Sequence, residues 1–182
     1  MEFLSTALED VIAIRPVVFE DNRGFFTETY LLNKFHKAGI HTPFVQDNLS
    51  RSVQNTLRGL HYQIINPQAK LVMVTSGEIL DVAVDIRRNS PNFGKYVGYR
   101  LSAANKIMLY IPAGFAHGFF VLSEEATFLY KCSDYYNPAG ERGIRWDDPD
   151  IHIEWPAARP VLSEKDQKLP FLSELDKKDL PA

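Results

Sequence analysis

The chain has 182 residues, 45% of them hydrophobic and 24% charged, a composition typical of one globular domain that buries most of its apolar surface. A formal net charge of −3 and an isoelectric point near 5.9 argue against a general role on nucleic acids or membrane surfaces. An anionic ligand would therefore have to be held by a local cluster of cations.

The N-terminal residues carry acidic side chains and lack the basic and then apolar pattern of a secretory signal. The longest apolar window, residues 111–122, is interrupted by a proline, a glycine and a histidine, so no membrane span is predicted. Cys132 is the single cysteine and cannot form an intramolecular disulfide, which suits a reducing compartment. We therefore expect a cytoplasmic protein without nucleic-acid or membrane partners.

Alternation of apolar and polar residues with period two dominates the chain and predicts many short strands. The first covers residues 25–30, after the turn sequence 21–24, and a helix over Leu31–Ala38 follows, ending at Gly39 in a left-handed cap. Further strands are predicted over residues 57–63, 70–76, 79–86, 96–101, 106–111, 118–122 and 126–133. In residues 79–86, one face is apolar and the other carries Asp81 and Asp85, which indicates solvent or a polar cavity on that side.

A second helix is predicted to begin at Ser163, as an N-cap followed by acidic residues in the first turn. The proline-rich residues 155–160 lead into a C-terminal tail that we expect to pack back over the barrel. No internal repeat or linker is visible. Many short strands and few short helices indicate an all-β fold, either a β-sandwich or a jelly-roll barrel.

The most informative segment runs from Leu57 to Val72, because it places Arg58, His61 and Lys70 within thirteen residues on two predicted strands. Two of these side chains are cationic, and histidine is the side chain whose ordinary pKa lies near neutrality. Such a group is suited to bind an anion, remove a proton and stabilise the resulting negative charge. Residue pattern alone leaves a histidine satisfied inside a barrel as an equal alternative for His61.

His117 lies in a Pro-x-Gly-x-x-His sequence that is similar to the second motif of cupin barrels, where the histidine often binds a metal. The first cupin motif commonly supplies a His-x-His pair, whereas the equivalent segment here reads His61-Tyr62-Gln63. Because a metal needs more ligands of the right type, we predict no metal and interpret His117 as a hydrogen-bond donor in the cavity.

Other polar residues are ambiguous from local pattern. Tyr130 is either a packing residue or a general acid, and Tyr136 is either a base-stacking residue or a surface aromatic. Asp166 fits a first-turn acid that complements a helix dipole. Arg23 and the segment Gln46-Asp47-Asn48 fit ordinary turn residues.

Several blocks, taken in order, carry a wider resemblance: Asp21-x-Arg23-Gly24-x-Phe26-x-Glu28, Phe44-Val45-Gln46-Asp47-Asn48, residues 57–63, Lys70-Leu71-Val72, residues 81–85, residues 111–119, Tyr130-Lys131-Cys132, Gly143-Ile144-x-Trp146-x-Asp148-Pro149 and residues 162–166. Their number, order and spacing from Phe19 to Asp166 resemble the dTDP-4-dehydrorhamnose 3,5-epimerase family. Where that family usually has glycine before Thr56, this chain has Asn55, which tolerates left-handed backbone better than most residues.

The resemblance implies a single jelly-roll, cupin-like epimerase domain over residues 1–182, without a cofactor and paired as a homodimer with strand exchange. It implies conversion of dTDP-4-dehydro-6-deoxy-D-glucose to dTDP-4-dehydro-L-rhamnose by proton transfer at C3 and C5. By matching position, His61 is the base, Tyr130 the proton donor, and Lys70 the stabiliser of the enolate. The resemblance also makes Asp166 the partner of His61, in place of its local interpretation.

The same resemblance assigns contacts to the dTDP-sugar, with Tyr136 stacking on thymine. The other matching positions are Arg23, Glu28, Gln46, Asp47, Asn48, Arg58, His117, Glu141 and Lys165. Three alternatives stay open: an epimerase acting at one carbon, a non-catalytic sugar-nucleotide sensor, and a metal-dependent cupin oxygenase.

Overall fold

The computed structural model describes residues 1–182 and is built almost entirely of β-strands. The strands are β1 (Glu2–Ser5), β2 (Ile12–Arg15), β3 (Val18–Asp21), β4 (Gly24–Thr27), β5 (Gln46–Val53), β6 (Leu57–Gln63), β7 (Lys70–Ser76), β8 (Glu78–Asp85), β9 (Tyr96–Ser102), β10 (Met108–Ile111), β11 (Phe115–Val121), β12 (Glu125–Cys132) and β13 (Glu141–Gly143). One helix, α1 (Leu32–Lys37), and four 3-10 turns complete the chain: Pro138–Gly140, Asp166–Lys168, Leu172–Glu174 and Lys177–Asp179. The predicted all-β class is confirmed.

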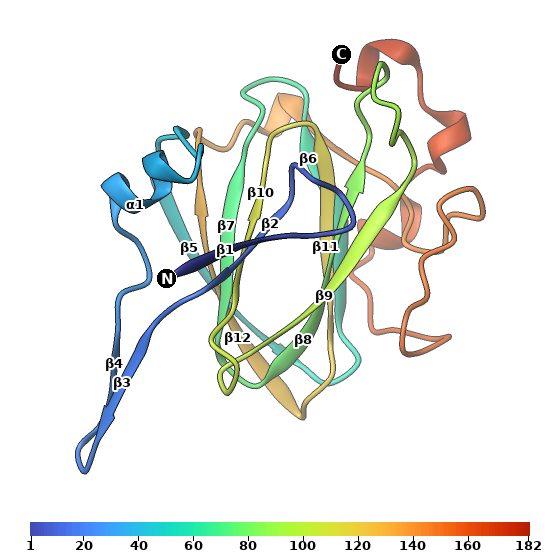
Figure 1. Ribbon diagram of the computed structural model, residues 1–182. Coiled ribbons are helices and arrows are strands. Elements are labelled where there is room, and N and C mark those ends of the chain that lie inside the picture. Colours follow the sequence, from blue (N-terminus) through green and yellow to red (C-terminus); the bar gives the residue numbers. More distant parts are fainter.

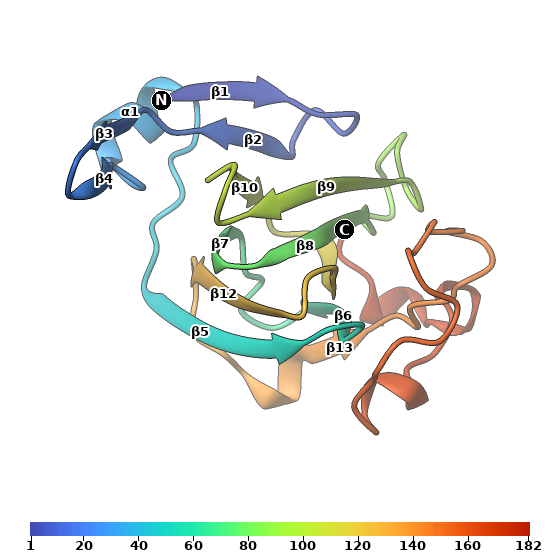
Figure 2. The ribbon, with the colours of Figure 1, turned by 90° about the horizontal axis from the view of Figure 1, so that it is seen from below.

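Hydrogen bonding divides the strands into three separate sheets. A six-stranded sheet has the order β1-β2-β10-β7-β12-β5, a five-stranded sheet has the order β13-β6-β11-β8-β9, and β3 pairs with β4 as a hairpin. The two larger sheets face each other and enclose the main apolar cluster (Figure 2). That cluster takes Val72 and Phe128 from one sheet, and Ile79 and Phe119 from the other.

Strand β8 follows the predicted alternation. Ile79 and Ala83 belong to the cluster between the sheets, whereas Val82 and Val84 belong to a second cluster on the outer face of the five-stranded sheet. Asp81, on the inner face with Ile79 and Ala83, is fully buried, so that face of the strand lines a polar interior instead of meeting solvent. One face of β8 therefore points into the space between the two larger sheets, and the other points toward the C-terminal chain.

The C-terminal chain covers the outer face of the five-stranded sheet (Figures 1 and 2). Ile151 and Leu172 are buried there against strand residues. Further along, the Tyr62 hydroxyl donates to the Asp179 carbonyl at 2.8 Å, and Arg142 forms an ion pair with the Asp179 carboxylate at 2.7 Å. These contacts hold residues 144–180 beside β6 and β13.

The first predicted helix is confirmed, since α1 ends beside Gly39, which has a left-handed φ of 84°. The second predicted helix is wrong: residues after Ser163 form only the 3-10 turn Asp166–Lys168. Leu169 leaves the turn in extended conformation because it precedes Pro170, and a residue before proline disfavours helical backbone. No helix in the structure is long and apolar enough to cross a membrane.

Each strand predicted from the period-two pattern is present, but β1, β2, β3, β5 and β13 were not predicted. The local interpretation of Gln46-Asp47-Asn48 as a turn is wrong, because these residues begin β5 and pair with β12. Arg23 does lie in a turn, between β3 and β4, and this hairpin projects away from the two larger sheets (Figure 1).

Candidate active site

A β-bulge in β6 places two cavity-facing side chains close together. His117 pairs with His61, but Phe119 pairs with Arg58, so two steps along β11 match three along β6. Strict alternation would turn Arg58 away from His61. The extra residue brings both side chains into the same cavity.

Glycine makes this bulge possible. Gly59 has a φ of 128°, and a Cβ atom on it would lie 2.6 Å from the Cα of Gly118 and 2.8 Å from the carbonyl oxygen of His117. Only glycine fits so close an approach of β6 to β11 at that backbone angle. Asn55 lies two residues before β6 and has a left-handed backbone, with a φ of 63°. Asparagine tolerates this conformation better than most residues.

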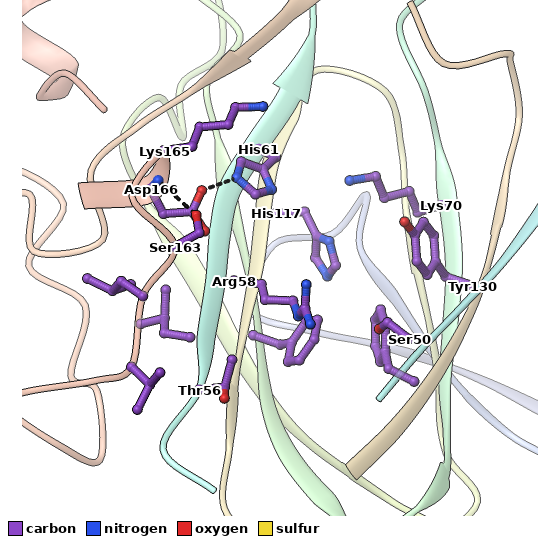
Figure 3. Close-up of a pocket in the computed structure, with 15 residues that line it drawn as sticks. Ser50, Thr56, Arg58, His61, Lys70, His117, Tyr130, Ser163, Lys165 and Asp166 are labelled. Atoms are coloured by element: carbon purple, nitrogen blue, oxygen red, sulfur yellow. Dashed lines mark hydrogen bonds and ion pairs between the residues drawn. The ribbon is translucent and has the colours of Figure 1, made fainter. Parts of the chain in front are cut away.

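His61 and Asp166 form a short hydrogen bond, with 2.6 Å between Nε2 and Oδ1 (Figure 3). Because the carboxylate accepts from Nε2–H, the lone pair of the neutral imidazole lies on Nδ1. Asp166 is 3% exposed and comes from the C-terminal chain, 105 residues after His61. The pair is thus an oriented proton acceptor assembled from distant parts of the sequence.

The turn that carries Asp166 keeps its carboxylate ionised. Burial acts to raise the pKa of Asp166, but hydrogen bonds from His61, Ser163 and the Gly59 backbone outweigh it and hold that pKa below its ordinary value. Ser163 also accepts a hydrogen bond from the backbone N–H of Asp166 at 3.1 Å. An ionised Asp166 can stabilise an imidazolium on His61.

Lys70 lies at the start of β7 and points into the same cavity (Figure 3). Burial lowers the pKa of Lys70, and the neighbouring side chains Cys132, Asp81 and Glu141 act against that shift. None of the ion pairs in the structure involves its ammonium group. Lys70 therefore offers its N–H donors to a ligand in the cavity.

Tyr130, on β12, lines the cavity with Lys70 on the side opposite His61 (Figure 3). Burial raises the pKa of Tyr130, with a further contribution from Cys132, while Arg58 lowers it. The phenol therefore carries its proton at neutral pH and can give it to a bound ligand.

His117 lies deeper and is paired with Asp81, with Nε2 at 2.9 and 3.1 Å from the two carboxylate oxygens. Burial lowers the pKa of His117, and Asp81 acts against the shift. In the neutral ring that donates from Nε2 to Asp81, Nδ1 is an acceptor. No group of three or more His, Cys, Asp or Glu side chains is arranged to hold a metal ion.

These side chains line a cavity with two lobes between the sheets. Lobe A, of about 410 Å³, is lined by Ser50, Thr56, Leu57, Arg58, His61, Lys70, His117, Phe119, Phe128, Tyr130, Val161, Leu162, Ser163, Lys165 and Asp166 (Figure 3). Lobe B, of about 270 Å³, is lined by Gln46, Asn48, His61, Tyr62, Gln63, Gln68, Lys70, Ile111, Phe115, His117, Tyr130, Cys132, Tyr136 and Glu141. His61, Lys70, His117 and Tyr130 line both lobes and so mark their junction.

A small polar network joins the two lobes, because Lys165 lines lobe A whereas Tyr136 and Glu141 line lobe B. Lys165 forms an ion pair with Glu141 at 2.5 Å, and the Tyr136 hydroxyl donates to the same carboxylate at 2.7 Å. Burial acts to raise the pKa of Glu141, but the hydrogen bonds from Lys165 and Tyr136 bring it below its ordinary value. An aromatic ring, a carboxylate and an ammonium group suit a polar ligand with a flat ring.

Three predicted contact residues lie away from the cavity. Arg23 is at the tip of the β3–β4 hairpin and pairs with Asp21 at 2.5 Å. Glu28 pairs with Lys34 at 2.7 Å, and Asp47 pairs with Lys131 at 2.9 Å. Within this chain, none of the three lines either lobe.

Sequence reasoning did not assign a role to several residues of the site. Asp81, the buried partner of His117, lines neither lobe but carried a signal, because an acidic residue on the second face of an alternating strand indicated solvent or a polar cavity. Gln63 also carried a signal, since it lies two residues after His61 and so shares a face of the same predicted strand. Ser50, Gln68 and Ser163 carried no signal, because single serine and glutamine residues in polar segments resemble ordinary surface residues.

The junction can perform proton transfer beside a carbonyl. His61 can take a proton, Tyr130 can supply one from the other side, and Lys70 can stabilise an oxyanion between them. All three lie where side chains from both lobes meet.

Known proteins are similar to this chain over nearly its whole length. A family model described as dTDP-4-dehydrorhamnose 3,5-epimerase matches residues 5–174. The dTDP-4-dehydrorhamnose 3,5-epimerase of Pseudomonas aeruginosa is 56% identical over 170 residues, covering 92% of this chain and 94% of that protein. The dTDP-4-dehydrorhamnose 3-epimerase of Streptomyces niveus is 38% identical over 176 residues, covering 96% of this chain and 85% of that protein.

A solved structure extends the similarity to three dimensions. The dTDP-6-deoxy-D-glucose-3,5-epimerase of Legionella pneumophila, in complex with dTDP-4-keto-L-rhamnose, superposes with a TM-score of 0.96. It is 47% identical and covers 99% of this chain and 97% of that chain. From the matched model, the identities and the shared fold, the chain belongs to the dTDP-4-dehydrorhamnose 3,5-epimerase family.

Proposed function

We propose that this protein is an isomerase that converts dTDP-4-dehydro-6-deoxy-D-glucose to dTDP-4-dehydro-L-rhamnose, in dTDP-L-rhamnose biosynthesis. The observation that carries the proposal is the His61–Asp166 pair, which faces Tyr130 across a cavity that also holds the ammonium group of Lys70. Membership of the family indicates which substrate this acid and base would act on.

Each inversion needs one proton removed and one returned. The C4 ketone of the substrate acidifies the protons on C3 and C5. His61 takes such a proton at Nδ1, and the electrons of the C–H bond move to the C4 oxygen, where Lys70 stabilises the enolate. Tyr130 then gives its proton to the opposite face of the carbon, and solvent restores both side chains. Neither a metal nor a nucleotide cofactor takes part in the proposed reaction.

The nucleotide is proposed to span the two lobes. Tyr136, in lobe B, would stack on thymine, while Arg58 and Lys165, which line lobe A, would balance the charge of the diphosphate. The other proposed contacts in the cavity are Gln46, Asn48, His117 and Glu141. These local cations explain how a chain with a net charge of −3 would bind a dianionic group.

We further propose a homodimer with strand exchange, in which the β3–β4 hairpin reaches the cavity of the partner subunit. The hairpin exposes Phe19 by 62% and Phe26 by 69%, and β5 exposes Leu49 by 68%, apolar surface that a second copy would cover. The exchange would bring Arg23 and Glu28 to the other subunit's substrate, and Asp47 would lie at the same interface.

In this proposal, residues 1–182 form one jelly-roll, cupin-like epimerase domain whose C-terminal tail packs on the barrel. The facing sheets and the apolar contacts of Ile151 and Leu172 support that description. A cytoplasmic location is proposed because the single cysteine, Cys132, is free and buried.

Incubation of the protein with its proposed substrate in D2O tests the reaction. Deuterium should enter at both C3 and C5, as measured by NMR of the recovered dTDP-sugar. The His61→Ala variant should give no exchange while its fold is retained. Absence of exchange at both carbons with the native protein would contradict the proposal.

A second candidate is an epimerase that acts at a single carbon with the same residues. The 38% identical relative from Streptomyces niveus is named as a 3-epimerase, and this similarity supports the second candidate. Deuterium at C3 alone would support this second candidate.

A further inference from the structure

The guanidinium group of Arg58 is anchored to the opposite sheet. Its Nε–H donates to the Ser52 hydroxyl oxygen at 2.9 Å, and its Nη2–H has only a longer contact of 3.5 Å with the Arg51 carbonyl oxygen. Arg58 lies on β6 of the five-stranded sheet, whereas Ser52 lies on β5, at the edge of the six-stranded sheet. The hydrogen bond from Nε therefore joins the two sheets beside lobe A, into which Arg58 points (Figure 3).

The alternation of β5 places Ser52 for this hydrogen bond. Arg51 and Val53 are exposed, and Arg51 pairs with Glu125 at the surface. Ser52 points the other way and is 6% exposed. Its hydroxyl has no other hydrogen-bond partner in the structure. Because a buried hydroxyl needs a partner, the contact with Arg58 accounts for a serine at this buried position.

The hydrogen bond to Ser52 leaves most of the guanidinium group available to a ligand. It uses the donor on Nε, whereas the donors on Nη1 and Nη2 can reach the oxygens of a phosphate. No carboxylate pairs with Arg58, in contrast to Arg51 and Arg87. A long side chain that is free in solvent loses rotamer freedom when a ligand fixes it. An arginine that is already fixed avoids part of this cost.

We propose that Ser52 is a positioning residue for the diphosphate, because it holds the guanidinium group of Arg58 at lobe A before the dTDP-sugar binds. This inference rests on the proposed function, in which Arg58 balances the charge of the diphosphate. Ser52 itself lines neither lobe. Its effect on binding should therefore be exerted only through Arg58.

A double-mutant cycle with dTDP as the ligand tests whether Ser52 acts through Arg58. Ser52→Ala should weaken dTDP binding by about 3- to 10-fold, the range expected for one hydrogen bond. Arg58→Ala should weaken it further. Addition of Ser52→Ala to Arg58→Ala should change the affinity by less than about 1.5-fold, because the side chain that Ser52 positions is gone. Calorimetric titration measures the affinity of each variant.

Ser123→Ala is the matched control. It also removes a hydroxyl that accepts a hydrogen bond, in this case from the Glu78 backbone N–H at 2.9 Å, but Ser123 lines neither lobe. This variant should bind dTDP as tightly as the native protein. Thermal unfolding shows whether each variant is folded. If Ser52→Ala does not fold, Ser52→Cys takes its place in the cycle, because a thiol is of similar size but is a weak acceptor.

Two results would overturn the inference while the proposed function stands. One is an affinity for dTDP that Ser52→Ala leaves unchanged. The other is an equal loss on removal of the hydroxyl in the native and Arg58→Ala backgrounds, because Ser52 would then act independently of Arg58. Failure of the native protein to bind dTDP would instead contradict the proposed function.

Discussion

Asp166 is ionised in a buried position. Its contribution to the stability of the folded protein should therefore decrease as the pH falls. Its pKa in the folded protein lies below the ordinary value, so its stabilising effect is full above the unfolded pKa of about 3.9. As the pH falls through the folded pKa, the carboxylate is protonated and that stabilisation is lost. Asp166→Asn removes the charge while keeping the shape of the side chain.

We predict that Asp166→Asn lowers kcat by about 10³-fold or more, because His61 loses the charged carboxylate that fixes its tautomer and stabilises its imidazolium form. The free energy of unfolding of the native protein should exceed that of the variant near pH 7, and the gap should narrow as the pH falls below about 4. Urea titrations between pH 2.5 and 7 measure this gap. Asp147→Asn is the control, since Asp147 is an exposed partner of Arg145. A gap independent of pH would contradict the role given to the carboxylate.

The bulge in β6 depends on a contact between two strands, because Gly59 lies against Gly118 of β11. We predict that Gly59→Ala destabilises the fold by about 3 kcal/mol or more, since it combines an unfavourable backbone angle with a collision against backbone atoms. The same change should displace Arg58 and His61 and lower activity. Thermal and urea unfolding measure the loss of stability.

Gly24 is the matched control for this element. Its φ of 129° is close to the 128° of Gly59, but a Cβ atom on it would meet nothing within 4 Å. Gly24→Ala therefore tests the backbone angle without the collision, and its cost should be smaller by about 1 kcal/mol or more. Equal losses in the two variants would show that the approach of β6 to β11 is not what requires glycine.

Elements with strong alternation were predictable, and elements with mixed faces were not. The strands that run through the apolar core, such as β7 and β8, have one clear apolar face and were predicted from it. Strand β5 was missed because it begins with Gln46-Asp47-Asn48 and exposes apolar residues on its outer face. The turn at Ser163 resembled a helix start because capping residues are common to helices and 3-10 turns.

The site was predictable only in part. His61 and Lys70 drew attention because ionisable residues sit within apolar strands. The position of Arg58 beside His61 requires the bulge, which no periodic pattern contains. Asp166 was identifiable through the family resemblance alone, since its contact with His61 spans 105 residues.

The hairpin β3–β4 gives the assembled protein a property that no single chain has. If Arg23 serves the partner subunit's cavity, Arg23→Ala and His61→Ala each disable a site, and in a mixed dimer both changes fall in the same site. One subunit of that dimer would have both His61 in its own cavity and a native Arg23 from its partner.

We predict that equal amounts of the two variants, unfolded and refolded together, recover about a quarter of the native rate. Half of the dimers should be mixed, and each should contain one intact site. The deuterium-exchange rate of the mixture measures the recovery, and each variant refolded alone is the control. A mixture no more active than its components would show that Arg23 does not act across subunits.

The late position of Asp166 has a consequence for synthesis. The last strand, β13, ends at Gly143, so a ribosome has made every strand and His61 before it reaches this aspartate. A chain cut or arrested before residue 166 would contain both sheets but would lack the partner of its histidine. In the proposed reaction, proton abstraction assisted by Asp166 would therefore begin only after the C-terminal chain has been translated and has docked beside His61.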